Sequence, residues 1–179
     1  MMVFHRFLAL LLATLAAAMA AHPAAAAPSE EEVKAAVAYN ILQFVVWPAA
    51  VFPPGQPLTL CVPETSGTAK GLARYEGMRV QGASLSFRVL GRHLDGLAAC
   101  RAVFVPAGDP YAVLRISAAT HGKPVLLIAE GDRVLEQGAG MGISLSGNHV
   151  VIDVDLTTLN AAGLVVSSKL LRLARTVVR

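Results

Sequence analysis

The sequence predicts an α/β fold: a single layered domain with a mixed, mainly parallel sheet, flanked by helices and extended by a late β-hairpin. Short, nearly continuous apolar runs recur along the chain, and such runs are typical of strands that are buried on both faces. Segments with helical periodicity stand between these runs, which is the order of elements in a layered α/β domain. Near the C-terminus, Gly147-Asn148 between two alternating segments predicts a hairpin turn.

The composition sets the outer limits. A length of 179 residues corresponds to one domain with a short appendage. A hydrophobic share of 55% with 15% charged residues excludes intrinsic disorder. The net charge of +3 is small and its basic residues are scattered, which argues against a nucleic-acid partner. Two cysteines exclude a disulfide-dense mini-protein and a zinc site with four cysteine ligands.

The appendage is the N-terminal segment. It begins with His5 and Arg6, continues as an apolar run, and ends in small residues. This is the layout of a secretory signal peptide, which predicts a leader over residues 1–26 and a mature domain over 27–179. An uncleaved membrane anchor is the alternative, but the uncharged stretch is shorter than the ~20 residues that a spanning helix needs. We therefore expect an exported protein.

The first element of the mature chain is a helix. Ser29 and Glu32 form a capping box at its start, and the acidic first turn suits the positive end of the helix dipole. The spacing of apolar residues predicts that the helix ends near Trp47, before Pro48. The side chains expected along its buried stripe are Val33, Val37, Asn40, Ile41, Phe44 and Val45.

The remaining elements follow from the same patterns. Strands are expected at residues 58–62, 85–90, 102–105 and 124–129. Helices are expected at 68–75, at 111–119 with Asp109 as its cap, at 157–162, and at 169–178 as the last element. Gly77 and Gly82 are expected in turns, and Gly163 at the end of a helix.

Cys61 and Cys100 are the clearest candidates for a defined structural role. Cys61 falls inside one expected strand and Cys100 directly precedes another, and neighbouring strands lie close enough for a disulfide. An exported chain meets oxidising conditions in which a disulfide persists. Closing a loop of about 40 residues would stabilise the fold by roughly 3.9 kcal/mol. Two free buried thiols or a redox switch are the alternatives.

Two features that suggest a ligand site lack its usual context. The glycine-rich segment 138–142 has no following Lys-Ser/Thr pair and no following helix, so it fits neither template for phosphate binding and is expected to be structural. His93, His121 and His149 are far apart and show no metal-ligand spacing. We expect no metal and no cofactor.

The search for a catalytic group has a similar outcome. Asp153 and Asp155 alternate along an expected strand and could form an acid/base pair, but acids on a solvent-facing side are the ordinary pattern. The chain has no GxSxG elbow, no SxxK motif and no cysteine partnered by a motif histidine. We therefore expect that the protein is not an enzyme.

A basic stripe is expected on the last helix. Lys169, Arg172, Arg175 and Arg179 recur at spacings that place them on one helix face. Such a stripe could contact an acidic partner or an anionic membrane surface, and Lys169, Arg172 and Arg175 are our candidates for partner contact. A solvated outer face is the alternative, because cations are favoured at a helix C-terminus.

The chain resembles the YfiR-like family of exported bacterial proteins at both ends. The opening helix contains Lys-Ala-Ala, Tyr-Asn, a Phe and Trp-Pro at the places where that family has them, within residues 33–48. The closing matches are Gly-Met-Gly-Ile at 140–143, Ala-Gly-Leu at 162–164 and Ser-Ser-Lys-Leu-Leu-Arg-Leu-Ala at 167–174. The resemblance covers essentially the whole mature chain. Ala139 and Gly142 depart from it, since the family more usually has Gly and Ile there.

The resemblance implies a non-catalytic periplasmic α/β protein. It would bind the periplasmic sensory part of an inner-membrane diguanylate cyclase and keep the cyclase inactive, so that its release raises cyclic di-GMP and promotes biofilm formation. Cys61 and Cys100 match a family disulfide by position. Some members carry a second cysteine pair near the late Gly-Met strand, which this sequence lacks, so redox sensing through that pair does not apply here.

Two hypotheses follow. The first is a periplasmic repressor of a membrane cyclase that acts by protein–protein contact. The second is a stand-alone periplasmic module that binds a small apolar or aromatic ligand at the strand ends of its sheet. A homodimer is compatible with either hypothesis.

Overall fold

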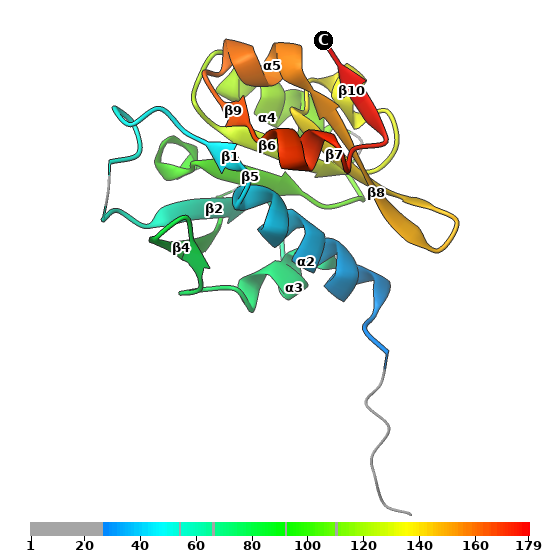
Figure 1. The fold of residues 1–179 in the computed structure, drawn as a ribbon. Helices are drawn as coiled ribbons and strands as arrows, with labels where there is room; N and C mark the ends of the chain where they lie inside the picture. Colours follow the sequence, from blue (N-terminus) through cyan, green and yellow to red (C-terminus); the bar gives the residue numbers. More distant parts are fainter. Residues whose placement is uncertain (1–26, 54, 66, 92, 110) are drawn as a thin grey trace, which may run out of the picture.

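The computed structural model describes residues 27–53, 55–65, 67–91, 93–109 and 111–179 (Figure 1). The signal peptide expected over residues 1–26 lies outside these ranges. The described ranges form an α/β structure around one eight-stranded sheet, which confirms the expected fold class.

The sheet is mixed and mainly parallel. Every neighbouring pair of strands is parallel except the β7–β8 hairpin and the β3–β4 pair at one edge. In sheet order the strands are β10 (Thr176–Val178), β8 (His149–Asp155), β7 (Met141–Ser146), β6 (Leu126–Glu130), β5 (Ala102–Val105), β2 (Leu58–Val62), β4 (Ala83–Val89) and β3 (Arg79–Val80).

The two faces of the sheet carry separate hydrophobic cores. Alternate residues of a strand serve opposite faces, so Leu60 joins one core and Cys61 joins the other. The first core is covered by α2 (Glu30–Leu42) and α3 (Thr68–Ala73), with α5 (Leu156–Ala161) and α6 (Ser168–Leu171) near the hairpin. The second core is covered by α4 (Ala112–Thr120) and the 3₁₀ turn η2 (Val134–Gln137), while a further turn, η1 (Leu97–Ala99), precedes β5.

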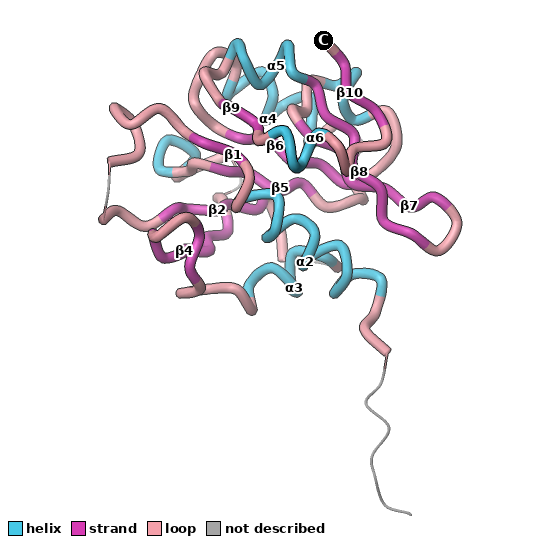
Figure 2. The backbone as a smooth tube through the Cα atoms, in the orientation of Figure 1, coloured by secondary structure: helices cyan, strands magenta, loops and turns pink. Residues whose placement is uncertain are grey.

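The first helix begins as expected and ends earlier. Ser29 and Glu32 make both hydrogen bonds of the capping box. The helix stops at Leu42, so the expected end near Trp47 is wrong. Val45–Val46 instead form strand β1, which pairs antiparallel with Val165–Val166, strand β9 (Figure 2). The backbone pairing of these β-branched residues with a distant segment outweighs the helical spacing of the apolar residues.

The buried face of α2 is also different from the expected stripe. Val33 and Asn40 are exposed, and the buried residues are Lys34, Ala35, Ala38, Ile41 and Leu42. The reason is the neighbouring helix α3, which packs directly on α2 (Figure 1). A side-chain carbon at Gly71 would come within 2.8 Å of the Ala35 side chain, so the helices meet through small residues. The apolar spacing in the sequence instead predicts larger residues, such as Val33 and Val37, on the buried face.

The C-terminal segment requires the largest correction. The expected helix over 169–178 is only the short α6, and Thr176–Val178 form the edge strand β10 parallel to β8. The Arg175 amide donates to the Ile152 carbonyl at 2.8 Å, which starts this pairing. The edge of β8 offers unpaired backbone groups, and the β-branched residues of β10 suit a strand better than a helix.

Most of the other expected elements are present with shifted ends. The strands at 58–62 and 102–105 match exactly in their bounds, and the hairpin turn lies at Gly147-Asn148. Gly77 and Gly82 have positive φ values of 76° and 88°, which explains glycine in these turns. Asp109 precedes α4 as expected, and its carboxylate accepts at 2.8 Å from the amide of Tyr111, which directly precedes the first helical residue Ala112.

Candidate functional site

The disulfide lies in the second core. The structure joins Cys61 and Cys100, the pair expected from the sequence, with a Cα–Cα distance of 5.8 Å. Both residues are fully buried. Cys61 lies on β2 and Cys100 lies just before β5, so the bond connects these two neighbouring segments. The described residues contain no free cysteine. The bond therefore has a structural position, away from solvent.

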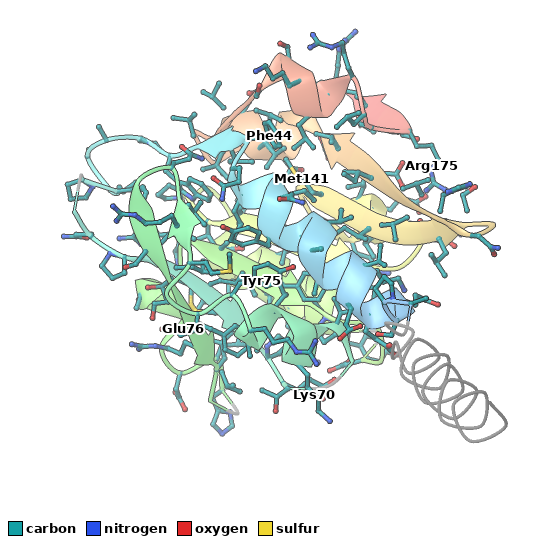
Figure 3. All side chains as sticks on the ribbon, turned by 60° about the horizontal axis from the view of Figure 1, so that its bottom comes forward. Phe44, Lys70, Tyr75, Glu76, Met141 and Arg175 are labelled. Carbon is teal, nitrogen blue, oxygen red and sulfur yellow. A yellow bond between two sulfur atoms is a disulfide. The ribbon has the colours of Figure 1, made fainter. Side chains whose placement is uncertain are left out.

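Arg175 does not belong to a basic helix face. It lies after α6 (Figure 3). Its guanidinium binds both carboxylate oxygens of Asp153 on β8, with the Nε–Oδ1 contact at 3.0 Å. A further contact reaches Ser144 on β7 at 3.4 Å. Arg175 therefore ties the C-terminal segment to the hairpin, and the expected stripe of four cations on one helix is wrong.

The ion pair shifts the titration of the carboxylate. Burial alone would raise the pKa of Asp153, but hydrogen bonds from Arg175 and Thr176 and the positive charge of Arg175 hold that pKa below its usual value. Asp153 is consequently ionised at neutral pH and committed to Arg175. This arrangement leaves no acid/base pair with Asp155, because the Asp155 carboxylate caps α5 through the Thr158 amide and hydroxyl.

Lys169 and Arg172 remain exposed to solvent. They belong to α6 and to its C-terminal cap, and neither has an ion-pair partner in the part of the chain that the structure describes. The next side chain, Leu173, is 70% exposed. A single exposed leucine is ordinary on a protein surface, so Leu173 is informative only together with other exposed apolar side chains near it.

Two further apolar side chains lie on the two-stranded β1–β9 ribbon, whose strand β9 directly precedes α6 in the chain. Val46 on β1 and Val165 on β9 are direct cross-strand partners, and they are 53% and 63% exposed. Cross-strand partners point to the same side of a ribbon, so these valines form one exposed apolar pair. Figure 2 shows α6 directly following this ribbon. We define the α6 face as Val46, Val165, Lys169, Arg172 and Leu173.

The sequence patterns missed the apolar half of this face. The helical spacing predicts Val46 in the last turn of the first helix, and Val165 falls between two expected helices. The signal that could have found them is the paired β-branched dipeptide, Val45-Val46 and Val165-Val166, in segments of low helical tendency.

A pocket lies at the amino ends of the parallel strands. Its volume is about 730 Å³, and three segments that precede β2, β5 and β6 form its walls. Arg101, Lys123 and His93 contribute its basic groups, while its other walls are mainly apolar. We call it the strand-base pocket. Sequence patterns did not identify it, because its walls come from three loops that are distant in the chain.

The opposite ends of the strands carry a buried ion cluster. The Lys34 ammonium lies 2.5 Å from a Glu30 oxygen and 2.6 Å from a Glu130 oxygen at the end of β6. Burial alone would lower the pKa of Lys34, but its hydrogen bonds to the two carboxylates raise it above its usual value. This cluster fastens α2 to the sheet, and its lysine is paired with two carboxylates.

The other residues considered from the sequence have structural surroundings. Side-chain carbons at Gly140 and Gly142 would come within 2.6 and 2.8 Å of Leu159 and Val134, so this segment is a close-packing region. Within the described ranges, no three histidine, cysteine or acidic residues come together as a metal site, and His93, His121 and His149 belong to different segments.

Comparisons with known proteins agree with this architecture. The family model described as YfiR/HmsC-like matches residues 31–175, and the chain therefore belongs to that family. Its members are periplasmic regulators of cyclic di-GMP signalling. A search of curated proteins finds no match. None of the helices in the described part of the chain is both long and apolar enough to cross a membrane.

Several solved chains match, and one of them shows the shared fold at low sequence identity. It is the crystal structure of a conserved domain protein from Vibrio cholerae O1 biovar El Tor strain N16961, with a TM-score of 0.54 and 10% identity. The match covers 83% of the present chain and 60% of the other chain. It supports the fold alone.

Proposed function

From this family membership we propose that the protein is a periplasmic repressor that binds the sensory part of an inner-membrane diguanylate cyclase. The observation that carries the proposal is the family match over residues 31–175. By holding the cyclase in an inactive state, the protein would lower cellular cyclic di-GMP.

Repression requires a difference in affinity between two states of the cyclase. A protein that bound both states equally would shift nothing, however tightly it bound. The contact surface must therefore fit a shape that only the inactive sensor presents. A rigid surface suits this task, and the α6 face is fixed by the β1–β9 ribbon and by the Arg175–Asp153 pair.

The α6 face is our proposed contact surface. It combines three exposed apolar side chains with two cations, Lys169 and Arg172, that have no partner among the described residues. Its partner should offer an apolar patch flanked by carboxylates, since such a surface would pair with both components. Arg175 is excluded from this surface because it is bound to Asp153.

Deletion and complementation test the function. Deleting the gene should raise cellular cyclic di-GMP, and restoring the full chain should lower it again. The chain without residues 1–26 should fail to restore repression, because it would stay in the cytoplasm. An unchanged level of cyclic di-GMP after deletion would contradict the proposal.

Charge reversal tests the contact surface. Lys169→Glu with Arg172→Glu should abolish repression, because like charges at an interface cost several kcal/mol. Lys70→Glu with Arg79→Glu is the matched control, since both residues are exposed and lie on α3 and β3, away from α6. Equal loss of repression in both double variants would remove the α6 face as the contact surface while leaving the function open to the deletion test.

A further inference from the structure

The strand-base pocket has a composition that favours one class of ligand. Arg101, Lys123 and His93 supply positive or hydrogen-bonding groups, and no acidic side chain lines the pocket in the described ranges. The remaining walls are mostly apolar, with Leu94, Leu97 and Val125 among them, and they also include Gln56 and Thr120. Such walls accept a hydrocarbon body, and the cations accept an anionic end.

Arg101 is held in place with donors to spare. Its Nε donates to the Val51 carbonyl at 2.9 Å and its Nη1 to the Cys100 carbonyl at 3.4 Å. A guanidinium has five N–H donors, so three remain beyond these two contacts. None of the ion pairs between described residues includes Arg101. The group is therefore oriented by backbone carbonyls and is available for an anion.

Lys123 lies in the loop before β6, next to the loop that holds Arg101 before β5. Its ammonium donates to the Ala119 carbonyl at 2.8 Å, which leaves two donors. The two strands are direct neighbours, since Leu126 donates its amide to the Arg101 carbonyl at 2.9 Å. Two cations thus border the same cavity from adjacent loops, without a described carboxylate to neutralise them.

The wall around Arg101 is rigid. The disulfide fixes Cys100, and the indole nitrogen of Trp47 donates to the Arg101 carbonyl at 2.9 Å. The Arg101 side chain in turn binds Val51 in the segment after β1. A pocket whose cation is held by a disulfide, an indole and a loop carbonyl is pre-organised, and a ligand would lose little free energy in ordering it.

We propose that the strand-base pocket binds a small amphipathic carboxylate, with its anionic group at Arg101 and Lys123 and its aryl or alkyl body against Leu94, Leu97 and Val125. The cavity of about 730 Å³ lies within the range of small-molecule sites. This inference does not depend on the proposed repressor function, because it concerns the isolated protein.

Binding can be measured with a probe series that changes only the charge. The probes are 4-phenylbutyrate, 4-phenylbutan-1-ol and 4-phenylbutylamine, which share one hydrocarbon body. Trp47 is the one tryptophan of the chain, so its fluorescence reports directly on the Arg101 wall, and calorimetry supplies the dissociation constants. We expect saturable binding of the carboxylate that is at least about tenfold tighter than that of the alcohol or the amine.

Variants locate the anionic group. Lys123→Gln should weaken the binding of 4-phenylbutyrate by about tenfold, the loss expected for one charge-assisted hydrogen bond, and should leave binding of the alcohol unchanged. Lys70→Gln is the matched control, because it removes the same charge from an exposed position on α3, which covers the opposite face of the sheet from α4. The control should bind the probe like the wild type.

Four outcomes would overturn the proposal: no saturable binding, equal affinity for the three probes, equal weakening by Lys70→Gln, or full displacement of the probe by inorganic phosphate at equal concentration. The last outcome would mean that the pocket recognises an anion alone. The wild-type comparison needs no variant, so the proposal can fail even if a substitution prevents folding. None of these results depends on cyclic di-GMP levels.

Discussion

At the scale of single residues, the disulfide and the Arg175–Asp153 pair each make a contribution to stability that can be measured. The first links β2 to the loop before β5, and the second fastens the C-terminal segment to the hairpin. Both act between segments that are far apart in the chain, so their removal should affect the whole fold.

Removing the disulfide should destabilise the protein. Cys61→Ser should lower the free energy of unfolding by about 2–5 kcal/mol, the usual cost of losing such a bond. Chemical denaturation of the oxidised wild type and of the variant measures this difference. Thiol titration of the unfolded, unreduced wild type should find no free thiol, and two reactive thiols per chain would contradict the bond.

The Arg175–Asp153 pair should make stability depend on pH. The folded-state pKa of Asp153 is lowered, so its contribution is present above the unfolded pKa of about 3.9 and is lost as the pH falls through the folded value. Asp153→Asn should cost about 1–2 kcal/mol at neutral pH, a value reduced by solvent screening at the 41% exposed Arg175.

The control for this pair is Asp132→Asn. Asp132 lies 3.9 Å from Arg175 but is 75% exposed, so its loss should change the free energy of unfolding very little. Denaturation at neutral and acidic pH checks both variants. If the difference in the free energy of unfolding between the wild type and Asp153→Asn is the same at neutral and acidic pH, the carboxylate charge is not the source of the effect.

At the scale of elements, the close approach of α2 and α3 depends on Gly71. A side-chain carbon there would lie 2.8 Å from the Ala35 side chain and 3.5 Å from the Glu31 carbonyl oxygen. Gly71→Val should therefore force the helices apart and lower the free energy of unfolding by about 2–3 kcal/mol. Thermal and chemical denaturation measure the loss.

An exchange of the two small residues is the matched test of this contact. Ala35→Gly together with Gly71→Ala returns one methyl group to the same space and balances the helix propensities. We expect the double variant to be more stable than the sum of the two single changes predicts, because the residues are in contact. Strict additivity would mean that the helices can move apart without cost.

At the scale of the whole molecule, the expected leader determines the compartment of the protein. Export would bring the chain to the compartment in which the disulfide persists and in which the proposed partner has its sensory part. We expect the secreted protein to begin at Ala27, because small residues precede this position as they do at signal-peptide cleavage sites. Mass spectrometry of protein from the periplasmic fraction measures this start. A chain that retains residues 1–26 and sediments with membranes would show an uncleaved anchor instead.

The α6 face and the strand-base pocket share no residue, and Trp47 is the structural link between them. Val46 of the α6 face directly precedes Trp47, whose indole binds the Arg101 carbonyl at the pocket wall. Trp47 fluorescence of the isolated protein reports on occupancy of the pocket, whereas repression in cells reports on the proposed partner contact.

The sequence by itself determined the elements whose signals are local. The capping box at Ser29 and Glu32 predicts the start of α2, because its hydrogen bonds join residues only three positions apart. The strands at 58–62 and 102–105 are visible as apolar runs because they are buried on both faces. The turn at Gly147-Asn148 is likewise a short-range preference, and together these signals were sufficient for the fold class.

Only the tertiary structure decided where a helix ends and the following residues become a strand that pairs with a distant segment. Val45–Val46 leave the helical pattern to pair with Val165–Val166, and Thr176–Val178 become a strand because β8 has a free edge. Arg101 and Lys123 likewise line the same pocket because β5 and β6, which they precede, pair in parallel. The free energy of such pairings comes from contacts between remote segments, and a local pattern holds no information about its remote partner.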